Sequence, residues 1–225
     1  MSTAQGTRRP VRLAGVAYDD YVRLRDAPGN RGLRMAYHDG VLEIMSPEYR
    51  HDREGRRLLL LVFAYCKAFG VPAEPAGSTT FRKGLPGRRK GKGKEPDESF
   101  FLGDAAVTMR GKETHDLDVD PPPSLWVEVD NWGSSKAKLS LYAGLGVPEV
   151  WRYTVRRREL WFGRLAGDHY EEIDASEALP GLTPDVVLDL LAQAKARGAS
   201  AWEDWLREEW FPALRREMND RAAGR

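Results

Sequence analysis

One acidic residue stands inside an otherwise apolar run, LWVEV at 125–129, and this run constrains the fold more than any other segment. Its composition predicts a central β-strand, in which side chains alternate and Glu128 shares a face with Asp130. A carboxylate buried in such a strand is costly unless it is paired or binds a metal ion. The sequence leaves two alternatives open: a functional site on this face, or an edge strand with Glu128 on its solvated side.

Two further residues could join Glu128. Asp97 follows a proline and precedes the apolar run SFFL, so it lies at the mouth of a strand, although a turn residue would fit equally well. Lys138 lies about one turn into the helix predicted after the strand of Glu128, with Tyr142 four residues further along the same face. Because that helix packs back against the strand, Lys138 can approach Glu128. Two acids on neighbouring strands and a lysine could hold Mg²⁺ and activate a water molecule.

The net charge of +1 hides a segregation of charges along the chain. The segment 82–94 is rich in glycine and lysine, contains no acid, and is predicted to be a mobile loop or a hairpin tip. Residues 95–130 carry ten acidic residues and only two basic ones. Basic groups bind phosphates and converging acids bind divalent metals, so we expect the basic segment to contact nucleic acid. A solvated hairpin is the alternative. The basic residues are Arg82, Lys83, Arg88, Arg89, Lys90, Lys92 and Lys94.

The order of the predicted elements indicates a mixed β-sheet flanked by helices, an α/β or α+β fold. Asp39-Gly40 between two β-rich runs is a strong hairpin signal. A helix is predicted from Pro47 to Phe69, with His51 on its inward face. We expect a flexible N-terminus at 1–14, one domain at 15–198, and a C-terminal helical extension at 199–225. The other predicted strands are 99–102, 125–129, 148–155, 159–164 and 169–173, and the other predicted helices are 136–145, 182–196 and 202–218.

Several classes of protein are excluded by composition. The single cysteine, Cys66, forms no internal disulfide and no cysteine-rich zinc site. The longest apolar run, 58–66, is too short to span a membrane, and the N-terminus has no signal peptide, so we expect a cytoplasmic protein. No dinucleotide-binding, phosphate-loop or zinc-protease motif is present. The tryptophans of the last predicted helix favour packing or a homo-oligomer, with a dimer as the expectation.

Five segments, in order and with plausible spacing, resemble the Uma-two family of restriction endonucleases in the PD-(D/E)XK nuclease superfamily. The resemblance covers about residues 15 to 190. Its most specific parts are the hairpin with the helix after it and the segment that ends in GVPEVW. The segments are MAYHDGVLEIMSPEYRH, STTFR, EPDE, LWVEV and SKAKLSLYAGLGVPEVW.

The resemblance implies a restriction-endonuclease-like fold, a Mg²⁺ or Mn²⁺ cofactor, and a site in which Asp97 and Glu128 hold the metal. The superfamily lysine is replaced by Asp130, and Lys138 matches the lysine that family members supply from the next helix. The family glutamate three residues before Asp-Gly is Ala36 here.

Three accessory roles remain open. Glu43, on the adjacent strand, could replace the missing glutamate, or it could lie on the surface. His51 matches a family histidine with an accessory or structural role. Asp130 could be a third ligand because it shares a face with Glu128.

Two function hypotheses follow from these residues. The first is a Mg²⁺-dependent endonuclease that hydrolyses DNA phosphodiester bonds with Asp97, Glu128 and Lys138. The second is a nuclease fold that has lost catalysis and binds DNA or a protein partner. The aspartate at 130 and the alanine at 36 favour the second hypothesis, whereas the retained pair of acids with Lys138 favours the first.

Overall fold

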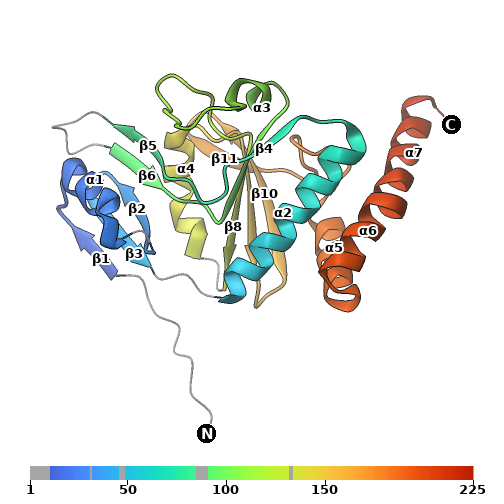
Figure 1. Ribbon diagram of the computed structural model, residues 1–225, viewed down its shortest axis with the longest axis horizontal. Helices are drawn as coiled ribbons and strands as arrows, with labels where there is room; N and C mark the ends of the chain where they lie inside the picture. Colours follow the sequence, from blue (N-terminus) through green and yellow to red (C-terminus); the bar gives the residue numbers. More distant parts are fainter. Residues whose placement is uncertain (1–10, 31, 46–48, 85–90, 132–133, 225) are drawn as a thin grey trace, which may run out of the picture.

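A small β-sheet forms the N-terminal side of the molecule (Figure 1). The computed structural model describes residues 11–30, 32–45, 49–84, 91–131 and 134–224, without the side chains of 49–51, 134 and 137. The strands of this sheet are β1 (Val11–Ala14), β2 (Arg34–His38), β3 (Val41–Met45), β5 (Phe81–Gly84) and β6 (Gly91–Lys94). They lie in the order β1-β3-β2-β6-β5, and all neighbours run antiparallel.

A second, larger sheet follows in the chain. Its strands are β4 (Ala73–Pro75), β7 (Glu98–Leu102), β8 (Leu125–Asp130), β9 (Glu149–Thr154), β10 (Glu159–Ala166) and β11 (His169–Glu172). Their order is β11-β10-β9-β8-β7-β4, in which β8 and β9 are parallel and the other pairs antiparallel. The predicted mixed sheet is therefore confirmed, with β8 at its centre.

Helices cover both faces of the larger sheet. The long helix α2 and the C-terminal helices pack on one face, and α4 lies on the other, between this sheet and the small one (Figure 1). The helices are α1 (Tyr18–Asp26), η1 (Pro28–Asn30), α2 (Tyr49–Phe69), α3 (Asp104–Met109), η2 (Ser134–Lys138), α4 (Leu139–Leu145), α5 (Pro184–Arg197), α6 (Ala199–Trp205), η3 (Leu206–Trp210) and α7 (Phe211–Ala222). None of the described helices is long and apolar enough to cross a membrane.

The alternation of β8 separates two hydrophobic cores. Leu125, Val127 and Val129 face the core shared with α2 and α5, whereas Trp126 faces the core shared with α4 and the small sheet. Glu128 follows Trp126 on the second face, since side chains two apart lie on one side of a strand. The candidate acid thus points into the space between the two sheets.

The two ends of the chain compare differently with the sequence-based expectation. Residues 11–14, predicted within a flexible N-terminus, form β1, whose Val11 pairs with Ile44 of β3. The helix predicted over 202–218 is confirmed, since α6, a π-helical turn at η3 and α7 follow one another without a break. Trp202 and Phe211 from this region are fully buried in the core shared with α2 and α5. The C-terminal helices are therefore packed against the domain.

Candidate active site

The segment 94–97 carries the chain from the small sheet into the large one, and it brings two candidate residues with it. Lys94 ends β6, and Asp97 lies in the bend just before β7. The preceding GKGK sequence is a strand because its glycines lie against tyrosines of α1. A Cβ at Gly91 would come within 2.4 Å of the Tyr18 ring, and one at Gly93 within 2.3 Å of the Tyr21 hydroxyl. The lysines of the motif therefore face the opposite side, toward α4 and the large sheet.

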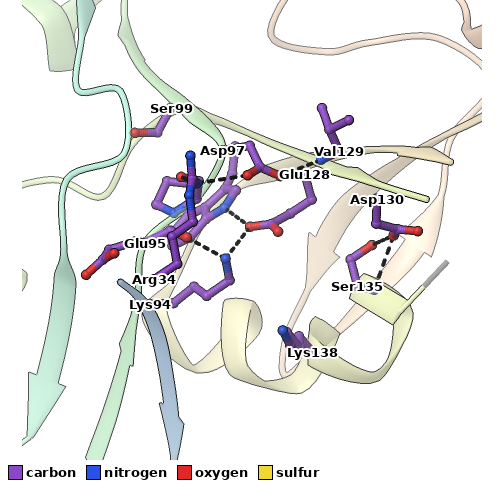
Figure 2. Close-up of polar contacts among 12 residues, drawn as sticks. Arg34, Lys94, Glu95, Asp97, Ser99, Glu128, Val129, Asp130, Ser135 and Lys138 are labelled. Atoms are coloured by element: carbon purple, nitrogen blue, oxygen red, sulfur yellow. Dashed lines mark hydrogen bonds and ion pairs between the residues drawn. The ribbon is translucent and has the colours of Figure 1, made fainter. Parts of the chain in front are cut away.

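Asp97 is held by both of its oxygens. Its Oδ1 accepts a hydrogen bond from Arg34 Nη1 at 2.8 Å, and its Oδ2 accepts one from the backbone N–H of Val129 at 2.7 Å. Arg34 Nη1 also donates to the carbonyl of Pro96 at 2.8 Å. These contacts fix the Asp97 carboxylate beside the peptide that follows Glu128 (Figure 2).

Glu128 is buried, and it has two close donors. Its Oε1 accepts a hydrogen bond from Trp126 Nε1 at 2.7 Å and lies 3.1 Å from Lys94 Nζ. Burial raises the pKa of the Glu128 carboxyl, the charge of Asp97 raises it further, and the charges of Lys94 and Lys138 oppose this rise. The charge of Asp97 therefore acts on the Glu128 carboxyl. That the two acids share a metal ion stays a prediction.

Lys94 was predicted to contact phosphates from a surface loop, and that prediction is wrong for the structure described. Its side chain is 3% exposed, with the ammonium against Glu128 and the carbonyl of Glu95. Sequence reasoning missed this residue because GKGK resembles a flexible loop. The only available signal was its place three residues before Asp97, which by itself indicates nothing.

Lys138 stands at the N-terminal end of α4 and points to the same region (Figure 2). Its Nζ forms an ion pair with Glu43 Oε2 at 3.0 Å, and both side chains are largely shielded from solvent. Glu43 in turn lies directly opposite Ala36 in the β2–β3 pairing. The structure therefore places an acid on the strand next to Ala36, paired with the lysine. A role for Glu43 in place of the missing glutamate stays a prediction.

A pocket of about 120 Å³ adjoins this ion pair. Its wall includes three basic side chains, those of Arg12, His38 and Lys138, together with Glu43 and the small Ala36. Groups of this kind suit a phosphate, because cationic donors on one wall offset its charge.

Tyr142 lies four residues after Lys138 and is fully buried on the ring of Trp126, with 5.4 Å between ring centroids. Burial first, and then the charges of Glu128 and Asp97, raise the pKa of its hydroxyl well above the ordinary value. Among the described residues its oxygen has no hydrogen-bond partner. A buried polar atom without a partner is unusual, so this hydroxyl is free to bind a water or ligand near the acids.

Asp130 shares the face of Glu128 but has structural partners. Its Oδ2 accepts from the backbone N–H of Ser135 at 3.2 Å and from Ser135 Oγ at 2.6 Å. Arg152 Nε donates to the same Ser135 hydroxyl at 2.9 Å. Asp130 thus anchors the start of η2, two residues away from Glu128 along β8 (Figure 2).

The remaining basic residues are spread over a hairpin. Arg82 pairs with Asp26 of α1, Lys83 is exposed, and Lys92 lies 4.0 Å from Asp39. The side chain of His51 and the predicted contacts at Arg88, Arg89 and Lys90 lie outside the described residues.

The donor set can be compared with what Mg²⁺ requires. No group of three or more His, Cys, Asp or Glu side chains that could hold a metal occurs in the described ranges. Mg²⁺ does not require one, because it is commonly bound by one or two carboxylates, waters and substrate phosphates. A carboxylate has about four lone-pair positions, and the donors described above occupy two on Glu128 and two on Asp97. The two acids therefore fit a magnesium ion that keeps most of its water.

Comparisons with known proteins identify a family and a similar fold. The sequence profile of the Uma2 family, described as "Putative restriction endonuclease", matches residues 18–194. A solved structure from Anabaena variabilis ATCC 29413, described as "a putative nuclease belonging to DUF820", is similar in fold, with a TM-score of 0.51 and 12% sequence identity. The similarity covers 77% of this chain and 98% of that one. No curated protein matches the chain.

Proposed function

The chain belongs to the Uma2 family, and from that premise we propose that it is a nuclease that hydrolyses phosphodiester bonds of DNA with Mg²⁺ or Mn²⁺. The observation that carries the proposal is the placement of Asp97 against the peptide next to Glu128, close enough for the charge of Asp97 to act on the Glu128 carboxyl. The cytoplasmic location and the dimer stay predictions from the sequence.

Asp97 and Glu128 would hold the metal ion. A bound divalent cation lowers the pKa of a water so that it can attack phosphorus, and it offsets the charge that develops on the phosphate. Arg34 keeps the Asp97 carboxylate in place through an ion pair of 2.8 Å. Lys138, held by Glu43 at the start of α4, would orient the attacking water or the phosphate.

The nucleic acid would approach over the pocket beside Lys138 and the β5–β6 hairpin. Arg12 and His38 line that pocket, and Lys83 is exposed on the hairpin. Arg12 and Lys83 offer positive charge to a phosphodiester backbone, and contacts of this kind carry most of the sequence-independent affinity for DNA.

A cleavage assay tests the proposal. Plasmid, linear duplex, single-stranded DNA and RNA are incubated with Mg²⁺, Mn²⁺, Ca²⁺ or a chelator. Cleavage is expected with the first two ions only. Asp97→Asn and Glu128→Gln should each reduce the rate by about 100-fold or more, because metal catalysis supplies several kcal/mol and each 1.4 kcal/mol is tenfold.

Glu171→Gln is the matched control, because this exposed glutamate of β11 pairs only with groups outside the site, such as Arg164. Its rate should equal that of the unaltered protein. If the purified protein with Mn²⁺ cleaves none of the four substrates, the proposed activity is wrong.

A second function is favoured by two observations. The ammonium of Lys94 already lies on Glu128, and Ala36 supplies no acid. Both features suit a protein of this fold that binds DNA or a protein partner without cleaving it. Tight DNA binding that is unchanged in Asp97→Asn, together with no cleavage, would establish this alternative.

A further inference from the structure

Lys94 is a buried charge beside Glu128 that the proposed mechanism does not use. We propose that Lys94 is a built-in counter-ion of Glu128, which occupies this carboxylate in the resting protein and must be displaced when a divalent metal binds. The proposal rests on the proposed function, because it concerns the metal that Asp97 and Glu128 would hold. It makes Lys94 a positioning residue that sets the metal affinity of the site.

The direction of the Lys94 side chain is fixed by packing on the opposite face of its strand. Gly93 lies under Tyr21, where even a Cβ would be only 2.3 Å from the tyrosine hydroxyl. Lys94 pairs with Phe81 on one side and with Ala36 on the other. The strand is thus held between two neighbours and beneath α1, so its last lysine is directed at Glu128.

Ala36 leaves the room that the Lys94 side chain uses. Directly paired residues of antiparallel strands present their side chains on the same face, so Lys94, Ala36 and Glu43 follow one another across β6, β2 and β3. A larger side chain at 36 would lie between the two charged ones. The alanine lies between Lys94 and Glu43 on the small sheet. Lys94 therefore pairs with Glu128 of β8, and Glu43 pairs with Lys138 at the start of α4.

Each acid of the site therefore has its own cation. Asp97 pairs with Arg34, Glu128 with Lys94, and Glu43 with Lys138. A divalent ion added to this balanced set would face an ammonium 3.1 Å from one of its ligand oxygens. Since like charges at that distance repel strongly in a buried site, the ammonium has to leave before the metal binds. A substrate phosphate brings negative charge and would favour that exchange.

Metal affinity without nucleic acid is the first test. Mn²⁺ binding is measured by electron paramagnetic resonance and by calorimetry on the full chain. Lys94→Met should bind Mn²⁺ at least about tenfold more tightly than the unaltered protein, because Glu128 no longer has a competing cation. Lys92→Met is the matched control for Mn²⁺ affinity, since Lys92 lies two residues away on the same strand and same face but pairs with Asp39. Its Mn²⁺ affinity should not change.

A metal-free measurement is the second test. Thermal unfolding is compared for Lys94→Met, Glu128→Gln and the double variant. Lys94→Met should lower the Tm by roughly 5–15 °C, because it leaves an uncompensated buried carboxylate, and adding Glu128→Gln should restore most of that loss. If methionine leaves too little folded protein, Lys94→Gln, which keeps hydrogen-bond donors, is measured in its place. Equal and additive losses would show that the two groups are not a pair.

The outcomes separate this inference from the proposed function. Tighter Mn²⁺ binding by Lys94→Met, with coupled stabilities and no cleavage of any nucleic acid, supports the counter-ion and refutes the nuclease. Metal-dependent cleavage together with unchanged Mn²⁺ affinity in Lys94→Met supports the nuclease and overturns the counter-ion. Mn²⁺ binding by neither protein also overturns the counter-ion as a competitor of the metal.

Discussion

The carboxylate of Asp97 accepts a hydrogen bond of 2.7 Å from the backbone N–H of Val129, the residue that follows Glu128. The β7–β8 pairing ends at Glu98 and Val127. The contact of Asp97 with Val129 lies just past that end and joins the bend before β7 to the central strand β8. The position of one proposed metal ligand is therefore set by the backbone beside the other. Whatever moves the 94–97 segment will change the spacing between the two acids.

Arg34 should be needed for that spacing. Its guanidinium donates to Asp97 and to the carbonyl of Pro96, and its side chain is only 19% exposed. Arg34→Ala should lower the free energy of unfolding by about 1.5–3 kcal/mol, the usual cost of removing hydrogen bonds to a charged group, and should reduce cleavage. Urea denaturation measures the first effect. Arg23→Ala, which removes an exposed pair with Asp20, serves as the control and should change neither property.

The β2–β3 hairpin and the shared face of Glu128 and Asp130 were predictable from local sequence patterns. Asp39-Gly40 connects β2 and β3 as expected, with both residues at positive φ, 45° and 94°. The alternation within LWVEVD predicted that Glu128 and Asp130 share one face, because side chains of a strand repeat with a period of two, and Trp126 lies on that face as well. The roles of these side chains in catalysis stay predictions.

The partners of the acids were not predictable, because they come from distant parts of the chain. Arg34 is 63 residues before Asp97, and nothing in its surroundings in the sequence indicates that contact. The lysines of GKGK were assigned to a loop, since glycine and lysine are typical of loops. Only the packing of Tyr18 and Tyr21 on the two glycines shows why the segment is a strand.

Gly93→Ala tests that packing directly. The new Cβ would lie 2.3 Å from the Tyr21 hydroxyl, which is buried under α1, so the strand or the helix must shift. Overpacking of this kind costs about 1–3 kcal/mol of unfolding free energy, and it should also displace Lys94. Gly29→Ala is the control, because nothing lies within 4 Å of a Cβ there. Equal stabilities of the two variants in urea would contradict the account of the GKGK strand.

Asp130→Asn should separate a structural acid from a metal ligand. Asp130 accepts both the backbone N–H and the hydroxyl of Ser135, so the change should destabilise the start of η2 by about 1–3 kcal/mol. Cleavage should fall much less than in Asp97→Asn. Ser135→Ala should cost a similar amount, and the double variant should lose less than the sum, because the two side chains share one hydrogen bond. A loss of activity as large as that of Asp97→Asn would instead make Asp130 a ligand.

Cys66 should make the stability depend on alkaline pH. Burial raises the pKa of its thiol to about 11, whereas a thiol in the unfolded chain ionises near about 8.5. Between these values the unfolded state loses the proton and the folded state keeps it. Stability contributed by Cys66 is thus complete below about pH 8.5 and falls as the pH rises, by at most about 1.4 kcal/mol per pH unit. The difference in unfolding free energy between the unaltered protein and Cys66→Ala should shrink over this range, and a constant difference would contradict the burial of the thiol.

The ion pair of Lys138 with Glu43 should act as a unit. Glu43 Oε2 lies 3.0 Å from the Lys138 ammonium beside the pocket. Glu43→Gln should therefore weaken the positioning of the lysine and reduce kcat by about tenfold. Lys138→Met should reduce kcat further and leave the Mn²⁺ affinity unchanged. Adding Glu43→Gln to Lys138→Met should then cost nothing more, because the only contribution of Glu43 is through the lysine. Single-turnover cleavage and Mn²⁺ titrations of the four proteins in the cycle measure this coupling. If Glu43→Gln lowers the rate equally with and without Lys138, the glutamate acts independently of the lysine, as it would if it filled the role of the acid missing at Ala36.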